Sequence, residues 1–294
     1  MNKFLERLNS GEILVADGAT GSNLQKMGLN PGQAPEDLVI DNPDILFKLE
    51  SMFVEAGSDI ILTCTFGGTR MRMNDSKYQD RAPEVNTRAA ELARKAASAR
   101  SGALVAGSMG PVGGLIKPYG PLEAEEVKVT FAEQAIALAE GGVDLLVIET
   151  MFSLEEATAA YEGARSATDL PIIVSFSYDR GTRSMMGVKP KDVMKKYTEM
   201  GANVIGANCG TTLENMEAII KEYAGAVPNF PMWAKPNAGV PHMDIQTERA
   251  IYDMSPDDMA VFAKKYVALG AKIVGGCCGS TPEHIAAIAR AVKP

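Results

Sequence analysis

The sequence has few of the residues that build disulfide frameworks or histidine-rich metal sites, with four cysteines and two histidines among 294 residues. It also lacks an uninterrupted apolar run of about 18 residues, which a transmembrane helix needs. The opening segment MNKFLERLNSGE is charged and has no apolar core of the kind found in signal peptides. We therefore expect a cytoplasmic protein that does not insert into a membrane.

Positive charge is scarce as well: 29 lysines and arginines stand against 37 aspartates and glutamates, a formal net charge of −8. The basic residues are scattered and form no stripe that could follow a phosphate backbone. Because an acidic surface repels nucleic acid, we expect no nucleic-acid partner. The hydrophobic content of 46% is enough for the core of one large soluble domain, which we expect to span residues 1–294.

Short apolar runs alternate with helical patterns along the whole chain. Eight of these runs are typical of buried strands, at residues 13–16, 60–63, 103–106, 145–148, 172–176, 204–207, 232–234 and 273–274. Between the runs, apolar residues recur three or four positions apart, as in the series Val127, Phe131, Ala135 and Leu138. The alternation predicts an α/β fold, a closed (β/α)8 TIM barrel, with an open doubly wound sheet as the alternative.

Residues that begin and end helices occur where this fold requires them. Asn42-Pro43, Ser255-Pro256 and Thr281-Pro282 each place a capping side chain before a proline, and Ser153 with Glu156 has the spacing of a capping box. Glycine ends a predicted helix just before a strand in AGSD, GGVD, MGAN and LGAK. The Gly/Pro-rich stretch 107–121 is predicted to be a loop after the third strand, on the face where barrel enzymes carry their active sites.

Residues that could carry chemistry follow the predicted strands directly. They are Asp17 after the first strand, Glu149 after the fourth, Cys209 after the sixth, Asn237 after the seventh, and Cys277 with Cys278 after the eighth. Because the carboxyl ends of barrel strands surround one opening, we expect these side chains to lie close together.

Three of the four cysteines, Cys209, Cys277 and Cys278, are candidate metal ligands. Thiolates favour a soft or borderline metal, and three protein ligands on zinc leave its fourth position open, which is typical of a catalytic site. The same cysteines are then the candidate catalytic residues. A strained vicinal disulfide or a redox pair is the alternative for the adjacent cysteines, although CxxC spacing is absent. Cys64, which stands alone, is more typical of a small buried hydrophobic residue.

An open zinc–thiolate site suits a thiol substrate, because coordination lowers the thiol pKa well below its usual value of about 8.5. The product would be an alkylated sulfur. Glu149 or Asp17 could pair with an ammonium group, and the turn that begins Asp17-Gly18 could offer backbone N–H groups to a carboxylate. Asp before Gly is also common in ordinary turns. Taken together, these residues predict a thiol amino acid as the substrate.

Seven motifs spread over nearly the whole chain carry a resemblance to a known family. They are ADGATGS at 16–22, TCTFGGTR at 63–70, GSMGPVG at 107–113, IETMFSLEEA at 148–157, GANCG at 206–210, KPNAG at 235–239 and GGCCGSTPEHI at 275–285. Together they resemble the zinc-dependent homocysteine S-methyltransferase family. The resemblance implies a (β/α)8 barrel that methylates homocysteine to methionine.

The resemblance also implies roles for individual residues. It assigns zinc to Cys209, Cys277 and Cys278 and homocysteine binding to Glu149 and the turn at Asp17 and Gly18. Asn208 and Asn237 match motif positions near the metal, where they would support the ligands or position the substrate.

The methyl donor is less sharply indicated. TFGGTR and GSMGPVG resemble the homocysteine-binding domain of cobalamin-dependent methionine synthase, whereas Gly67 replaces a tyrosine of betaine-dependent members. No folate or cobalamin module follows in the sequence, which ends at Pro294, so the resemblance implies a corrinoid protein acting in trans or a small donor such as S-methylmethionine. The alternatives are a corrinoid-dependent enzyme acting on another thiol or methyl donor, and a zinc-binding module without catalysis.

Overall fold

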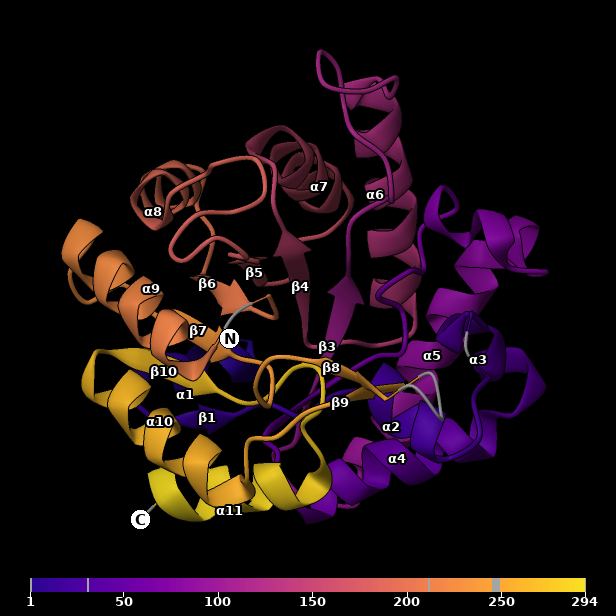
Figure 1. The fold of residues 1–294 in the computed structure, drawn as a ribbon. Coiled ribbons are helices and arrows are strands. Elements are labelled where there is room, and N and C mark those ends of the chain that lie inside the picture. Colours follow the sequence, from indigo (N-terminus) through magenta and orange to yellow (C-terminus); the bar gives the residue numbers. More distant parts are fainter. Residues whose placement is uncertain (1, 31, 211, 245–248, 294) are drawn as a thin grey trace.

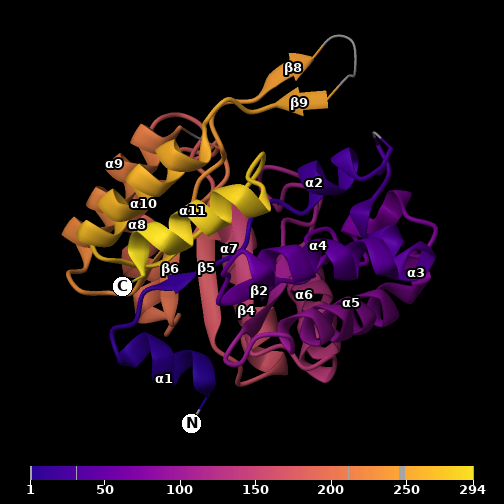
Figure 2. The same ribbon diagram turned by 90° about the horizontal axis from the view of Figure 1, so that it is seen from below.

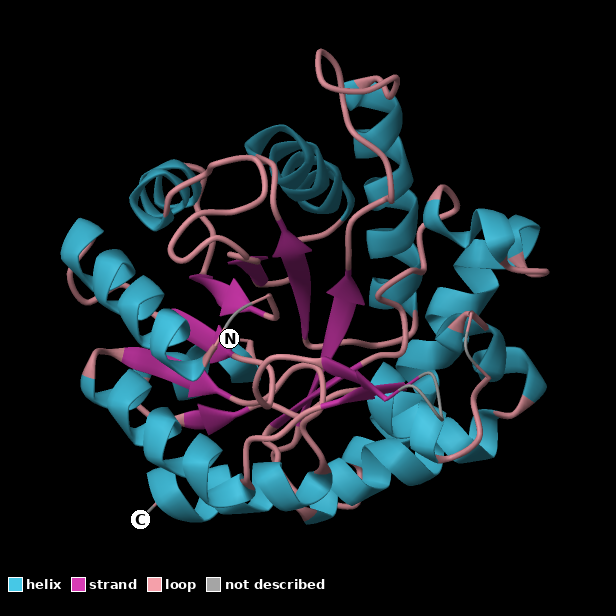
Figure 3. Ribbon diagram, viewed as in Figure 1, coloured by secondary structure: helices cyan, strands magenta, loops and turns pink. Residues whose placement is uncertain are grey.

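The computed structural model describes residues 2–30, 32–210, 212–244 and 249–293. Within these residues, eight parallel strands form a ring that is enclosed by helices (Figures 1 and 3). The strand order is β1-β10-β7-β6-β5-β4-β3-β2, and parallel pairing of Ala16 with Ile60 joins the two ends. The predicted TIM barrel is therefore confirmed, and the open doubly wound sheet is excluded.

Every predicted apolar run overlaps a strand of the barrel. The strands are β1 (Leu14–Val15), β2 (Ile60–Leu62), β3 (Leu104–Met109), β4 (Leu145–Met151), β5 (Ile172–Phe176), β6 (Val204–Asn208), β7 (Met232–Lys235) and β10 (Ala271–Val274). Several strands extend beyond the predicted runs, most of all β3 and β4, because polar Ser108 and Glu149 follow their apolar runs but still belong to the strands. The predicted loop after the third strand thus begins at Gly110, and Glu149 lies within its strand.

One helix precedes the first strand, and the others lie between or after the strands and pack around the ring. They are α1 (Lys3–Asn9), α2 (Gly21–Lys26), α3 (Leu38–Asp41), α4 (Pro43–Glu55), α5 (Ala82–Ala97), α6 (Ala124–Glu140), α7 (Leu154–Ala167), α8 (Pro190–Glu199), α9 (Leu213–Ala226), α10 (Pro256–Ala268) and α11 (Pro282–Val292). Short 3-10 turns lie at Pro35–Asp37, Arg72–Asp75 and Gln79–Arg81. No helix among the described residues has the length and apolar character needed to cross a bilayer.

The predicted helix starts are confirmed at all four places. Ser153 accepts a hydrogen bond from the backbone of Glu156, and Ser255 forms a reciprocal capping box with Asp258. The side chain of Asn42 makes no capping hydrogen bond, so at α4 the proline alone marks the start. The predicted glycine stops are confirmed as well, since glycines such as Gly57 adopt positive φ just after a helix ends.

The amino end of the barrel is closed by α1. Phe4 and Leu8 of this helix belong to one apolar cluster with the inward-facing side chains of the strands, including the fully buried Trp233. Figure 2 shows α1 at one end of the barrel and the hairpin of β8 (His242–Asp244) and β9 (Arg249–Ile251) at the other. A filled interior leaves the carboxyl ends of the strands as the place where side chains can face a cavity.

The β8–β9 hairpin was not predicted. Its strands pair with each other antiparallel and belong to no other sheet. Met243 and Ile251 are exposed, so the hairpin has no buried face and lacks the apolar alternation that marks a strand. The chain returns from the hairpin at Tyr252, whose ring packs so closely on Gly279 that a Cβ there would lie 2.2 Å from Tyr252 Cγ.

The loop between β3 and α6 is tied to the barrel rim by a buried carboxyl group. Glu156 Oε1 accepts a 2.7 Å hydrogen bond from the backbone N–H of Val112. The backbone N–H of Gly110 donates to the carbonyl of Phe66 at 3.0 Å. Glu156 Oε2 has no hydrogen-bond partner among the described residues.

This anchor makes the stability of the fold depend on pH. Burial raises the pKa of Glu156 from 4.5 to about 7, and the Val112 N–H only partly opposes that rise. Between these two values the unfolded chain releases a proton that the folded chain keeps. The free energy of unfolding should therefore fall as pH rises from 4.5 to about 7, by up to about 3 kcal/mol from this group.

E156Q should remove this dependence while its amide oxygen still accepts from Val112. Urea unfolding of the wild type and the variant across this pH range measures the difference. E155Q, which changes the exposed neighbour, is the matched control and should follow the wild type. Parallel curves for the wild type and E156Q would contradict the assignment.

Candidate metal centre and substrate cavity

Three sulfur atoms from two distant loops meet at the carboxyl end of the barrel. Cys209 follows β6, and Cys277 and Cys278 follow β10. Their Sγ atoms all lie within 4.8 Å of one another, and the Cys209 and Cys278 sulfurs are 3.8 Å apart. A tetrahedral zinc with Zn–S bonds of about 2.3 Å requires neighbouring sulfurs about 3.8 Å apart. The predicted convergence is confirmed, and the spacing fits zinc.

Backbone hydrogen bonds from the segment 235–238, at the end of β7 and directly after it, hold the two cysteine loops together. The N–H of Cys209 donates to the carbonyl of Lys235 at 3.1 Å, and the N–H of Cys277 donates to the carbonyl of Pro236 at 2.7 Å. The N–H of Ala238 donates to the carbonyl of Cys278 at 2.9 Å. Cys209 itself has a φ of 59°, in the left-handed region that non-glycine residues seldom adopt. The cluster therefore depends on strained local geometry that the neighbouring strand supports.

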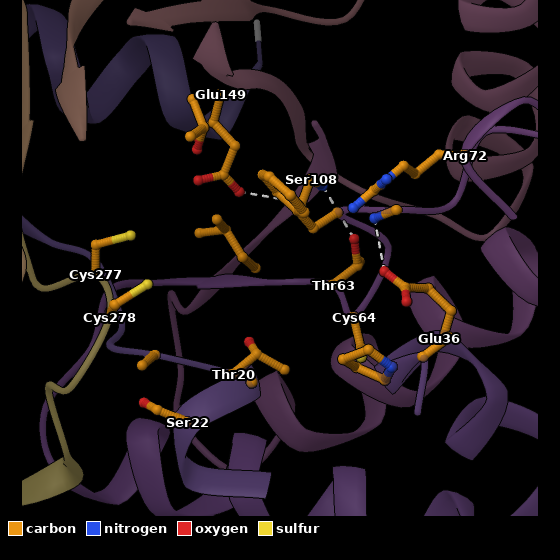
Figure 4. A pocket seen from close by; sticks show the side chains of 18 of the residues that line it. Thr20, Ser22, Glu36, Thr63, Cys64, Arg72, Ser108, Glu149, Cys277 and Cys278 are labelled. Carbon is orange, nitrogen blue, oxygen red and sulfur yellow. Dashed lines mark hydrogen bonds between the residues drawn. The ribbon is translucent and has the colours of Figure 1, made fainter. Parts of the chain in front are cut away.

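The glycines around the cysteine pair permit close backbone approach. A Cβ on Gly276 would lie 2.3 Å from Ser280 Oγ, which is too close for any other residue. Ser280 Oγ donates back to the carbonyl of Cys277 at 2.6 Å. This turn directs both adjacent side chains to the same side, where Figure 4 shows the sulfurs of Cys277 and Cys278 facing one cavity.

Ionisation of these thiols needs a cation. Contact with Cys209 raises the pKa of Cys277, Cys278 acts in the opposite direction, and burial raises the pKa further. Three thiolates this close would repel one another strongly in a buried site. A divalent ion that prefers sulfur relieves that repulsion, and zinc is the ion with this preference and a tetrahedral geometry. The donor set thus suits zinc and disfavours magnesium or calcium.

Asn208 connects the metal ligands to an acidic residue. Its Nδ2 donates to Glu149 Oε2 at 3.1 Å and to Thr150 Oγ1 at 2.7 Å, and lies 3.8 Å from Cys277 Sγ. Its Oδ1 accepts from Thr150 N at 2.9 Å and from Ser175 Oγ at 2.6 Å. With both ends of its amide engaged, Asn208 has a single orientation. It therefore holds the carboxylate at a set place beside the cluster.

Glu149 faces the cavity with its carboxylate fixed from two sides. Ser108 Oγ donates to its Oε1 at 2.6 Å, opposite the bond from Asn208. Burial raises the pKa of Glu149, while the charge of Lys235 and the bond from Ser108 lower it. In Figure 4 this carboxylate points into the same space as the cysteine sulfurs. Glu149 is thus placed to bind a cationic group of a molecule whose sulfur lies at the cluster.

Asp17 and Glu149 both lie near the cysteine cluster, but only Glu149 lines the cavity. Asp17 Oδ1 is 2.7 Å from Lys235 Nζ, and its Oδ2 accepts from the N–H of Leu62 at 2.7 Å. The Asp17 carboxylate therefore has internal partners on both oxygens, and the residue does not line the cavity. Gly18 does line it, and a Cβ there would lie only 2.7 Å from Phe53 Cε1.

Asn237 is buried beside the ligand loops. Its Oδ1 has no hydrogen-bond partner among the described residues, and it does not line the cavity. It lies near the metal ligands, because its neighbours Pro236 and Ala238 make the backbone bonds to Cys277 and Cys278.

The cavity in front of the cluster has a volume of about 570 Å³. Several lining residues were not predicted from sequence, namely Thr20, Ser22, Glu36, Arg72, Ser108 and Lys235. Lys235 begins the KPNAG motif at the end of a predicted strand, and this position is a sequence signal for a site residue. Glu36, whose Oε1 accepts from Gly67 N at 2.6 Å, offers no comparable signal because it lies far from any strand. Figure 4 shows Glu36, Arg72 and Cys64 across the cavity from Cys277 and Cys278.

The fold and this site define the class of protein, a TIM barrel with a three-cysteine metal centre that faces a cavity of substrate size. The model of the homocysteine S-methyltransferase family matches residues 14–292. The chain therefore belongs to the homocysteine S-methyltransferase family, and the resemblance seen in the sequence motifs is confirmed.

Similar proteins agree with this assignment. A methionine synthase of Mycobacterium leprae is 29% identical over 295 residues, which cover 95% of this chain and 24% of that protein. A methionine synthase of Mycobacterium tuberculosis is 29% identical over 298 residues, which cover 96% of this chain and 25% of that protein. The chain thus spans about a quarter of the length of these curated relatives.

The fold also matches solved structures. The metallated form of the homocysteine methyltransferase MmuM from Escherichia coli superposes with a TM-score of 0.84 at 24% identity, covering 98% of this chain and 99% of that one. Its apo form superposes with a TM-score of 0.78, also at 24% identity, covering 99% of this chain and 100% of that one. At this identity the likeness establishes the shared barrel fold.

The cysteine cluster predicts a graded loss of zinc in variants. C209A, C277A and C278A should each weaken zinc binding by more than about 100-fold, because each removes a ligand. N208A should weaken it by about 10- to 100-fold, the usual effect of losing a residue that orients a ligand. Competition with a chromophoric chelator measures these affinities.

C64A is the matched control, since Cys64 is a free cysteine outside the cluster. It should bind zinc as the wild type does. A loss in C64A as large as that in C209A would show that the three-cysteine assignment is wrong.

Proposed function

We propose that the protein is a zinc-dependent methyltransferase that transfers a methyl group to the thiol of homocysteine, giving methionine. The observation that carries the proposal is that the three sulfurs and the Glu149 carboxylate face one cavity of about 570 Å³. Family membership supports the acceptor, and the sulfur-rich donor set supports the metal. Cys209, Cys277 and Cys278 would hold the zinc.

Different residues around the cavity would bind different groups of the substrate. Glu149 would bind the ammonium group, because its carboxylate is buried, oriented by Asn208 and Ser108, and faces the cavity. The proposal assigns the ammonium to Glu149 instead of Asp17, whose oxygens already have partners. The turn at Gly18, together with the nearby hydroxyl of Thr20, would receive the carboxylate.

The reaction exchanges one bond for another. The substrate thiol loses its proton, its sulfur forms a bond to the methyl carbon, and the donor–methyl bond breaks with its electron pair remaining on the donor. Bound zinc supplies positive charge that lowers the pKa of a thiol in its open position. The protein's contribution is to bring the amino acid to the cluster in one orientation and to exclude water from the surrounding cavity.

Two kinds of methyl donor are compatible with this site: a methyl-corrinoid protein that docks in trans, and a small sulfonium such as S-methylmethionine. The experiment that separates them supplies the zinc-loaded protein with homocysteine and, in turn, methylcobalamin and S-methylmethionine, and detects methionine by mass spectrometry. Methylation from either donor supports the proposal. Bound zinc without methylation of homocysteine or of another thiol by any donor would reject catalysis and leave a zinc-binding module.

The role of Glu149 predicts a specific change in substrate selectivity. E149Q should raise KM for homocysteine by about 10- to 100-fold, because a buried carboxylate paired with an ammonium is replaced by a neutral amide. The same variant should act almost normally on the desamino analogue of homocysteine, a thiol that has no amino group. Steady-state kinetics with both thiols measure the change.

E155Q is again a suitable control, since Glu155 is exposed on α7. It should keep the wild-type preference for homocysteine over its desamino analogue. Equal losses by E149Q on both thiols would show that Glu149 does not recognise the amino group.

A further inference from the structure

Lys235, at the end of β7, is a buried cation inside an acidic site. Among the described residues that are buried, it is the one lysine or arginine, with 2% of its surface exposed. Its Nζ lies 2.7 Å from Asp17 Oδ1 and 5.4 Å from the centre of the Trp233 ring. It also lines the cavity that holds Glu149 and the cysteine sulfurs. A lysine is rarely buried so fully without a specific electrostatic reason.

The surrounding charges supply that reason. Lys235 Nζ donates to Asp17 Oδ1 at 2.7 Å, the geometry of an ion pair, and the side chain lines the same cavity as Glu149 and Cys277, whose negative charges favour its ammonium form. With zinc bound, three thiolates and the carboxylates of Asp17 and Glu149 would carry five negative charges against the two positive charges of the metal. Without a further cation, the cavity would hold a large uncompensated negative charge in a medium of low dielectric.

Asp17 fixes the position of the Lys235 ammonium group. Its second oxygen accepts from the N–H of Leu62, and its backbone N–H donates to the carbonyl of Ile60 across the seam that closes the barrel. Its carbonyl accepts from the N–H of Gly276, which directly precedes Cys277. The Asp17–Lys235 pair therefore links β1, β2 and β7 to the loop that carries two of the metal ligands.

We propose that Lys235 is a positioning residue of the methyl-transfer site, whose ammonium group, held by Asp17, offsets the negative charge of Glu149 and of the zinc–thiolate cluster. The cavity can then hold a carboxylate and an anionic metal centre side by side. The part of this proposal that concerns homocysteine rests on the proposed function, whereas the part that concerns zinc does not.

Four variants separate this role from a purely structural one. K235M removes the charge and keeps a flexible side chain of similar length over Trp233. D17N keeps an oxygen that can accept from Leu62 but removes the charge. D17N/K235M leaves neither charge buried alone, so it should recover most of the stability that K235M loses. K195M, on the exposed surface of α8, is the matched lysine control.

Three measurements are made on the full chain: thermal unfolding, zinc affinity by chelator competition, and homocysteine binding to the zinc-loaded protein by calorimetry. We expect K235M and D17N/K235M to bind zinc and homocysteine each about tenfold more weakly than K195M. The double variant should nevertheless unfold close to the wild-type temperature. Restored stability without restored binding is the signature of a positioning residue.

Two outcomes would overturn the proposal. One is a double variant that regains wild-type zinc and homocysteine affinity along with its stability, which would make the pair a structural clamp. The other is K235M with the zinc affinity of K195M. If the wild type binds zinc but not homocysteine, the proposed function fails, while the zinc comparison between K235M and K195M still decides the role of Lys235.

Discussion

The site depends on the three backbone hydrogen bonds by which the end of β7 and the residues directly after it, the segment 235–238, join the cysteine loops. Cys209 and Cys277 both donate to carbonyls of this segment, and Ala238 donates back to Cys278. Sulfur atoms separated by nearly 70 positions in the chain are thereby placed at the spacing that a tetrahedral ion requires. The pairing of β7 with both β6 and β10 is the precondition, because it places the two cysteine loops on either side of the end of β7.

Charge is the second constraint on the site. Buried carboxylates and thiolates would be costly without cations. Two sources of positive charge are available to them: a metal ion held by the cysteine cluster, and the one buried lysine among the described residues. Asn208 and Ser108 add neutral hydrogen bonds that orient Glu149 without changing the charge. Two kinds of group thus have separate tasks, since ions balance the charge and neutral donors set the direction of the carboxylate.

Much of the fold could be predicted because its periodic elements are local. Buried parallel strands such as Ile172–Phe176 are continuous apolar runs, and proline with a capping serine marks the start of α10. The β8–β9 hairpin escaped prediction because its exposed residues have no buried face to impose a pattern. Ser108 was missed as well, since it lies in the Gly/Pro-rich stretch 107–121, which was interpreted as a loop after the strand.

Residue identity alone indicated the kind of chemistry, through the rarity of cysteine and histidine, the family motifs, and the positions of Cys209, Cys277 and Cys278 after predicted strands. The tertiary structure decided which carboxylate is available to a ligand. Asp17 and Glu149 look equivalent along the chain. Asp17, however, is engaged by two partners from other strands, Lys235 of β7 and Leu62 of β2. Only closure of the barrel brings those donors to Asp17, so pairing of a charge across the ring is a property of the folded chain.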